Sequence, residues 1–318
     1  MQAALRSAVP LSGAQHEIAA GPYRAVAVGG GGGVRTLSHE GRDLLDGYRA
    51  DALPDGARGQ VLAPWPNRLR DGSWSYGGRG HRLPVDDVAG GHAIHGLVRW
   101  ASWDAVLHTD RRVVLRHRLQ ARPGYPFPLD LLTDHAVDAR DGLTVELVAR
   151  NPGTSAAPVA LGMHPYLVAP DGGPVDRCAL RLPARSRVLV DDQRLPCGVA
   201  AVEGTGYDLR HGPVLGTLVL DDAYTDLDAD EHGRVSVRLT APDGTATTLW
   251  TEGPVGWLQV FTGDTLAPGR RRRSVAVEPM TAPANALATG EGLVLLGPGE
   301  QLRLRWGVRA ERAAPAPV

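Results

Sequence analysis

Apolar and polar residues alternate along most of the chain, with the period of two that places successive side chains on opposite faces of a β-strand. The alternation is clearest in residues 113–119, 143–148, 235–239 and 302–308. The 3.6-residue period of an amphipathic helix does not persist beyond a turn or two anywhere in the sequence. This pattern predicts many half-buried strands and very little helix.

Turn signals separate these segments at short intervals. Asp141-Gly142 precedes the segment at 143–148, and Asp243-Gly244 lies between 235–239 and 245–250, as in a β-hairpin. The 40 glycines and 25 prolines are spread along the chain, so no linker divides it. We therefore predict an all-β fold, a large single-domain antiparallel β-sandwich over residues 1–308, followed by a disordered tail at 309–318.

Composition and charge narrow the class of partner. With 318 residues, 43% of them hydrophobic, the chain can form a large core. A net charge of −1 argues against nucleic-acid binding, and no apolar run approaches the length of a membrane span. Cys178 and Cys197 do not make a disulfide framework, and no signal-peptide pattern opens the chain. We expect a cytoplasmic protein, monomer or homodimer, that binds a small neutral molecule.

Two low-complexity runs have a structural interpretation and a functional one. The five glycines at 29–33 lack the lysine and the serine or threonine of a phosphate-binding loop, so we expect a flexible hairpin there. The four arginines at 270–273 follow Pro268-Gly269 and are typical of a solvated loop, with a phosphate site as the alternative.

Four segments place polar residues inside apolar stretches bounded by proline or glycine, where burial is costly without a purpose. They are residues 63–70, 91–100, 161–166 and 275–283. In the last, alternation puts Val275 and Val277 on one face of a strand and Glu278 on the other, and Pro279 is expected to end the ladder. The Glu278 carboxylate should therefore point away from a sheet face.

These segments, in this order, resemble the signature motifs of the aldose 1-epimerase, or galactose mutarotase, family. The motifs are Asn67-Arg68-Leu69, His95-Gly96, His164-Pro165-Tyr166, Glu278-Pro279-Met280-Thr281, and Asp221 in Leu220-Asp221-Asp222. The resemblance covers about residues 20 to 308. Two features depart from the family pattern: the segment Ala-Pro-Trp-Pro precedes Asn67, and Asp222 replaces a histidine often found there, which leaves the particular sugar open.

The resemblance implies a galactose mutarotase-like supersandwich and an isomerase that interconverts the α and β anomers of a free aldohexose. It implies that Glu278 takes the proton of the C1 hydroxyl, that His164 protonates the ring oxygen, and that His95 steadies that oxygen or the neighbouring hydroxyl. Arg68 and Asp221 would bind sugar hydroxyls. Neither a metal nor another cofactor is implied. At neutral pH we expect an ionised Glu278, which should raise the pKa of a nearby histidine.

Three other functions stay open on the sequence alone. Two histidines and a carboxylate could form a non-haem iron site. A non-catalytic sugar-binding β-sandwich would keep the pocket and lack the chemistry. A hexose-6-phosphate epimerase would need cationic side chains, which Arg70 or the arginines at 270–273 could supply. Five tryptophans are candidates for stacking on a sugar or for filling the core: Trp65, Trp74, Trp100, Trp103 and Trp257.

Overall fold

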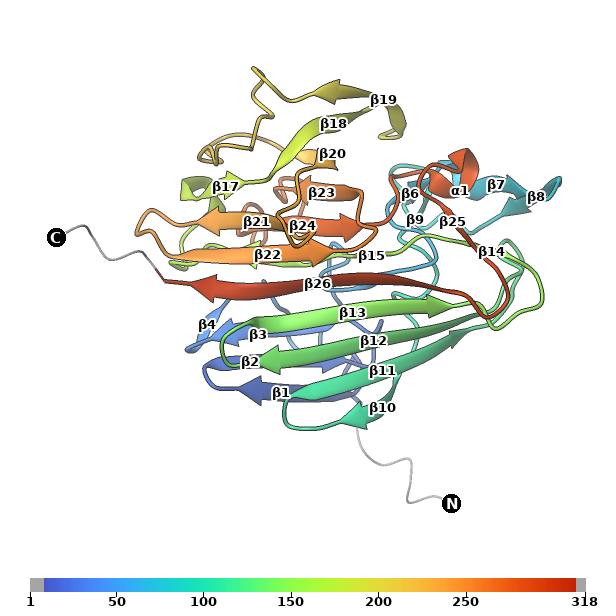
Figure 1. Cartoon of the computed structure of the whole chain (residues 1–318), viewed down its shortest axis with the longest axis horizontal. Coiled ribbons are helices and arrows are strands. Elements are labelled where there is room, and N and C mark those ends of the chain that lie inside the picture. The colour runs from blue at the N-terminus through green and yellow to red at the C-terminus, as the bar shows by residue number, and fades with distance from the viewer. Residues whose placement is uncertain (1–8, 313–318) are drawn as a thin grey trace.

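The computed structural model describes residues 9–312 and is built almost entirely of antiparallel strands. One of its two eight-stranded sheets crosses the front of the molecule in Figure 1. This sheet has eight strands, in the spatial order β10 (Asp104–His108), β11 (Arg112–Leu119), β12 (Leu129–Asp138), β13 (Gly142–Arg150), β26 (Gln301–Glu311), β22 (Ala246–Glu252), β21 (Val235–Thr240) and β17 (Ala179–Arg181).

A second eight-stranded sheet supplies most of the functional site. Its order is β19 (Pro196–Ala201), β18 (Ala184–Val190), β20 (Asp221–Leu227), β23 (Trp257–Phe261), β24 (Ser274–Met280), β15 (Gly162–Met163) and β5 (Val61–Leu62), and β16 (Tyr166–Val168) also pairs with β24. A four-stranded sheet contains β1 (Gln15–Ala20), β2 (Tyr23–Val28), β3 (Val34–His39) and β4 (Arg42–Asp43).

Smaller elements surround these sheets. Two-stranded sheets join β6 (Arg68–Leu69) to β9 (Ala93–Ile94), β7 (Ser73–Tyr76) to β8 (Arg79–Arg82), and β14 (Ala157–Val159) to β25 (Val294–Leu296). The α-helix α1 spans only Ala286–Thr289, and 3-10 turns occur at Arg70–Gly72 and Val175–Arg177. No helix among residues 9–312 is long and apolar enough to cross a membrane.

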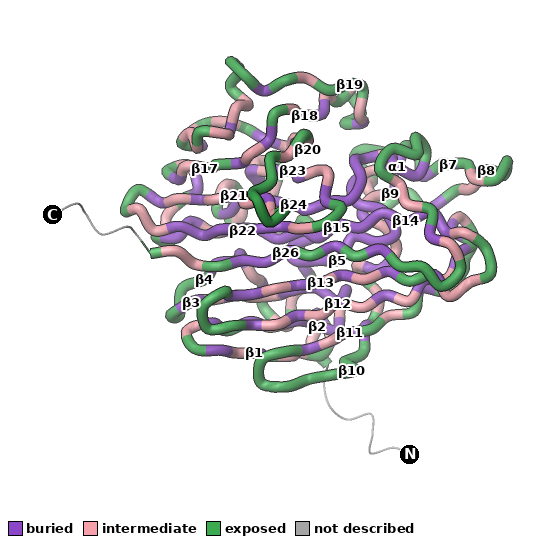
Figure 2. Tube along the Cα trace, viewed as in Figure 1, coloured by how far each residue is buried: buried purple, intermediate pink, exposed green. Residues whose placement is uncertain are grey.

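The sheets pack as a sandwich around one continuous hydrophobic core. β1 and β2 of the four-stranded sheet contact β12, and β24 of the second eight-stranded sheet contacts β26. Both sheets therefore pack against the first eight-stranded sheet, the large sheet. In β13 the alternate residues Val145, Leu147 and Ala149 are fully buried, which is the burial that the period of two predicts. Figure 2 shows buried positions through the middle of the sheets and an exposed edge strand, β10.

The predicted all-β sandwich is therefore confirmed, as are the four strands and both hairpins. β12 and β13 are joined through Asp141-Gly142, and β21 and β22 through Asp243-Gly244. The expected end of the domain at residue 308 is too early, because β26 pairs with β22 as far as Glu311. The Glu311 carboxylate also accepts hydrogen bonds from Arg238 and Thr248. The rest of the predicted tail, residues 313–318, lies outside the described residues.

The glycine run at 29–33 joins β2 to β3, as predicted, but it is packed and not a flexible loop. A Cβ atom on Gly33 would lie 1.9 Å from the Gly59 carbonyl oxygen, and one on Gly31 would lie 2.4 Å from the Arg99 carbonyl oxygen. The glycines are therefore needed for close approach of neighbouring backbones.

Beside this run, a buried histidine should make stability depend on pH. Burial lowers the pKa of His135 to about 4, against a smaller opposite effect of its hydrogen bond to the Gly32 carbonyl. As the pH falls, the His135 imidazole takes up a proton near pH 6.5 in the unfolded chain, but in the folded chain it does so only near pH 4. The free energy of unfolding should thus fall between pH 7.5 and pH 5, by about 2 kcal/mol through this residue.

Denaturant titrations at the two pH values check this prediction. On acidification, the free energy of unfolding of His135→Leu should fall by about 2 kcal/mol less than that of the wild type. The Gly32 carbonyl keeps a hydrogen-bond donor in this variant, because Thr133 also donates to it. The control is His232→Leu, at a side chain that is 82% exposed. Equal pH dependence in wild type and His135→Leu would contradict the assignment.

Candidate active site

Strand pairing places His164 opposite Glu278. Gly162 of β15 pairs with Met280 of β24, and Tyr166 of β16 pairs with Ala276, so the same antiparallel register aligns 164 with 278. β15 and β16 are separated at His164-Pro165, opposite Glu278 and Val277, whereas Pro279 lies opposite Met163 within β15. Pro279 thus does not end the strand as expected: β24 continues to Met280. The interruption of the ladder leaves the His164 side chain facing Glu278.

The two side chains are in contact and almost completely buried. His164 Nε2 lies 3.2 Å from Glu278 Oε1, and the side chains are only 6% and 3% exposed. Within the described residues, His164 Nδ1 and Glu278 Oε2 are buried without a hydrogen-bond partner. Buried polar atoms are usually paired, so these two unpaired atoms mark the pair as a candidate functional site.

Burial, more than the contact between them, controls the charge of this pair. Desolvation raises the pKa of Glu278 well above its ordinary value, and the negative charge of Asp221 raises it further. Desolvation also lowers the pKa of His164, with a further contribution from the nearby Arg58 charge. The expectation of an ionised Glu278 and a raised histidine pKa is therefore wrong for the free protein, in which the neutral forms of both groups are favoured.

His95 lies beside this pair with a defined tautomer. Its Nδ1 accepts a hydrogen bond of 3.2 Å from the Asn67 backbone N–H, and its ring lies 5.2 Å from that of His164, centroid to centroid. Burial lowers the pKa of His95 well below its ordinary value. A neutral imidazole that accepts at Nδ1 carries its proton on Nε2, so His95 is a hydrogen-bond donor.

Asn67 and His95 both have positive φ, at 54° and 61°. They flank the short β6–β9 pair, in which Arg68 is opposite Ile94, and the His95 backbone N–H donates to the Asn67 carbonyl. Left-handed backbone at a non-glycine residue is unfavourable and is often found at functional sites.

The opposite side of the site is a polar network on β20 and β23. Gln259 is the cross-strand neighbour of Glu278, and its Nε2 donates to Asp221 Oδ1 at 2.8 Å. Asp221 also pairs with Arg194 at 3.0 Å. Arg68 Nε donates to Asp87 Oδ2 at 3.0 Å. Protein partners thus fix the orientations of Arg68 and Asp221.

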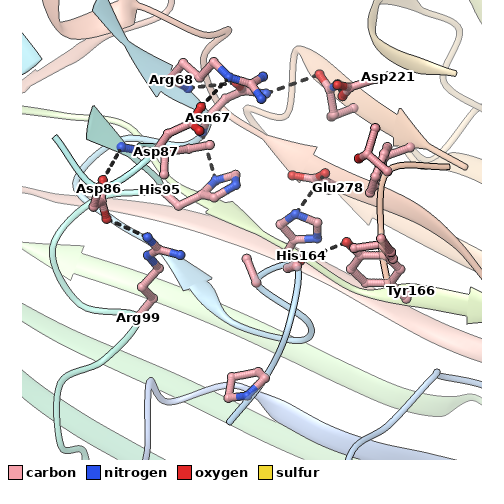
Figure 3. Close-up of a pocket in the computed structure, with 18 of the residues that line it drawn as sticks. Asn67, Arg68, Asp86, Asp87, His95, Arg99, His164, Tyr166, Asp221 and Glu278 are labelled. Atoms are coloured by element: carbon pink, nitrogen blue, oxygen red, sulfur yellow. Dashed lines mark hydrogen bonds and ion pairs between the residues drawn. The ribbon is translucent and has the colours of Figure 1, made fainter. Parts of the chain in front are cut away.

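All five predicted site residues, Glu278, His164, His95, Arg68 and Asp221, line one cavity of about 380 Å³. This size is in the range of small-molecule sites. Figure 3 shows the histidines and Glu278 inside it, with Arg68 and Asp221 above them. Sequence reasoning missed several lining residues, among them Asp86, Asp87, Arg99 and Gln259, and it named Tyr166 only as part of the His164 motif. The adjacent acidic residues Asp86-Asp87, close before His92, were a visible but weak signal.

Other candidates from the sequence lie elsewhere. Of the five tryptophans, only Trp100 lines this cavity, and it is 55% exposed. Arg70 binds Asp191 and Gln193 away from the cavity. In the arginine run, Arg270 pairs with Asp46 and Arg272 with Asp176 and Asp264, so the loop is held by ion pairs. Asp222 pairs with Arg187 and is absent from the cavity lining.

The site residues do not form a metal centre of recognisable geometry. Across residues 9–312, no three His, Cys, Asp or Glu side chains are placed to hold one ion. The Nδ1 lone pair of His95 is already occupied by the Asn67 N–H. This arrangement favours proton transfer over metal ligation.

Comparison with known proteins identifies the family to which this large β-sandwich belongs. The family model of aldose 1-epimerase matches residues 15–309. The uncharacterized protein YihR of Escherichia coli K12 is 32% identical over 301 residues, which cover 95% of this chain and 94% of YihR. Mouse galactose mutarotase is 30% identical over 173 residues, 51% of this chain and 48% of the mouse protein.

Solved structures share the fold at lower identity. The GalM/aldose epimerase homologue of Caenorhabditis elegans superposes with a TM-score of 0.84 at 20% identity, over 95% of this chain and 99% of its own. A galactose mutarotase-like protein of Clostridium acetobutylicum gives 0.81 at 17% identity, over 93% and 94%. The chain belongs to the aldose 1-epimerase family. It is therefore an isomerase.

Proposed function

We propose that the protein is an aldose 1-epimerase that interconverts the anomers of a free aldohexose by general acid–base catalysis. The observation that supports this most directly is the buried contact of 3.2 Å between His164 Nε2 and Glu278 Oε1. The C1 hydroxyl and the ring oxygen of a pyranose are bonded to the same carbon, so two adjacent proton-transfer groups can reach both.

Ring opening moves one proton to the enzyme and one to the sugar. Transfer of a proton from Glu278 Oε1 to His164 Nε2 first creates a carboxylate and an imidazolium from the neutral pair. Glu278 then accepts the proton of the C1 hydroxyl while His164 protonates the ring oxygen, and the C1–ring-oxygen bond breaks to give the aldehyde. After rotation about the C1–C2 bond, the reverse transfers close the ring on the other face.

The surrounding residues would bind and orient the sugar. His95, with its proton on Nε2, donates to the ring oxygen or a neighbouring hydroxyl. Arg68 and Asp221 bind other hydroxyls through charge-assisted hydrogen bonds. Their partners Asp87 and Gln259 hold them in place before the sugar arrives, which limits the entropy that binding must overcome. No step requires a cofactor.

Polarimetry with freshly dissolved α-D-glucose, α-D-galactose and glucose 6-phosphate tests this proposal. We expect the protein to accelerate mutarotation of a free hexose over buffer. The phosphate ester should be a poorer substrate, because Arg70 and the arginines at 270–273 are absent from the cavity lining and Arg70, Arg270 and Arg272 are held by other residues.

Two results would point elsewhere. Preference for glucose 6-phosphate would favour a hexose-6-phosphate 1-epimerase. Quenching of tryptophan fluorescence by a sugar, with no acceleration, would indicate a non-catalytic sugar-binding protein. The cytoplasmic location and the monomeric or dimeric state expected from the sequence stay predictions.

A further inference from the structure

A fully buried arginine lies directly behind the proposed acid. The Arg58 side chain is 2% exposed, and its Nη1 pairs at 2.7 Å with Asp46, whose side chain is wholly buried. Arg58 is absent from the cavity lining, so it is not placed to contact a sugar. A buried ion pair is costly to desolvate and adds little stability by itself. Stability alone therefore does not explain the buried Arg58–Asp46 pair.

Tyr166 connects Arg58 to His164. The Arg58 guanidinium carbon lies 4.3 Å from the centre of the Tyr166 ring. That ring stacks on the His164 imidazole with an angle of 6° between the planes and 5.0 Å between the centres. The Tyr166 hydroxyl donates to the Gly56 carbonyl at 2.8 Å, which fixes the ring at its far end.

The backbone holds the same two segments together. The Gly59 N–H donates to the His164 carbonyl at 2.8 Å, and the His164 N–H donates to the Gln60 carbonyl at 3.2 Å. The Asp46 N–H donates to the Tyr166 carbonyl at 2.9 Å. Arg58, its partner Asp46 and the stacked rings thus form one packed unit behind the catalytic pair.

We propose that Arg58 is a positioning residue for this reaction: held by Asp46, it keeps Tyr166 packed on His164 and so aligns the imidazole with Glu278. The inference rests on the proposed mutarotase activity. Alignment matters because proton transfer depends steeply on geometry, and a displacement of about 1 Å costs on the order of a hundredfold in rate.

The charges around His164 give a second measurable consequence. Glu278 faces it from β24 and neutral His95 from the end of β9, whereas Arg58 and Arg99 are the nearby positive charges. Positive charge disfavours the imidazolium. Loss of the Arg58 guanidinium should therefore ease protonation of His164 and move the acidic limb of kcat/KM to higher pH.

Arg58→Met tests the proposal by kinetics. Asp46 keeps Ser274, Arg270 and Arg273 as partners in this variant, so its charge is not left unpaired. We expect kcat to fall about tenfold to a hundredfold, KM to stay within about twofold, and the acidic limb to shift. Arg58→Gln serves as a second variant should Arg58→Met fold poorly.

Variants of Tyr166 test whether Arg58 acts on His164 through the Tyr166 ring. Tyr166→Leu, which removes the stack, should reproduce the loss of kcat. Tyr166→Phe, which keeps the stacked ring but loses the hydroxyl bond to Gly56, should lose less kcat than Tyr166→Leu. The double variant Arg58→Met/Tyr166→Leu should be no slower than the slower single variant, because both act through one contact.

The matched control is Arg234→Met, which removes a guanidinium that packs 4.1 Å from the Trp250 ring in the large sheet. Unchanged kcat and pH profile in folded Arg58→Met, or additive losses in the double variant, would overturn the inference. Normal mutarotation in Glu278→Gln would instead overturn the proposed function, so the two failures are distinguishable.

Discussion

Replacing Glu278 with glutamine should slow catalysed mutarotation by about two to four orders of magnitude and leave sugar binding intact. Glutamine keeps the size of the side chain and its hydrogen-bonding oxygen, but it neither accepts the C1 hydroxyl proton nor supplies a proton to His164. The measurement is the polarimetric rate at saturating sugar, with affinity followed by tryptophan fluorescence.

A measurement of thermal stability distinguishes loss of catalysis in Glu278→Gln from misfolding of the variant. Glu278 is buried, and desolvation raises the pKa of its carboxyl. At neutral pH the Glu278 carboxyl must take up a proton on folding, and glutamine avoids that cost, so the Tm of Glu278→Gln should equal or exceed that of the wild type. Glu291→Gln, at an exposed position in a loop, is the matched control and should keep full activity. A near-normal rate in Glu278→Gln would remove Glu278 from the role of base.

His164→Gln should lower kcat by a similar factor, about two to four orders of magnitude, because the ring oxygen loses its proton donor. The glutamine amide can still hydrogen-bond to Glu278 Oε1, which limits rearrangement of the pocket. Because the lost group acts in the transition state, KM should change much less than kcat. The exposed His232, changed to glutamine, is the control.

The double variant Glu278→Gln/His164→Gln tests whether the two groups act as one unit. Residues that exchange a proton in a single step are not additive, so the double variant should be about as slow as either single variant. A double variant slower by the product of the two factors would mean that the groups act in separate steps, contrary to the proposed proton exchange.

The sequence was informative about the site where a residue type carries the chemistry. Glu278, His164 and His95 lie in short motifs bounded by proline or glycine, and the structure brings them to one cavity. Gln259 and Arg58 gave no such signal. Gln259 becomes relevant only through its pairing with β24, and Arg58 only through its packing on Tyr166.

The fold class was predictable because strand alternation is a local property: every second side chain faces the same side, whatever the neighbours are. Turn residues add equally local information, and the pattern at 235–250 alone predicts the β21–β22 hairpin. The close packing of the glycine run was not predictable, because it depends on Gly59 and Arg99 of other segments.

By itself, then, the sequence determined an all-β sandwich and the candidate proton-transfer residues that its motifs carry. Only the tertiary structure decided that His164 lies opposite Glu278, because that alignment comes from the register of β15 and β16 on β24. It also decided the direction in which burial shifts the pKa of each side chain. The pKa of a side chain depends on the water and charges that distant segments remove or bring near, and neither is encoded in the residues beside it.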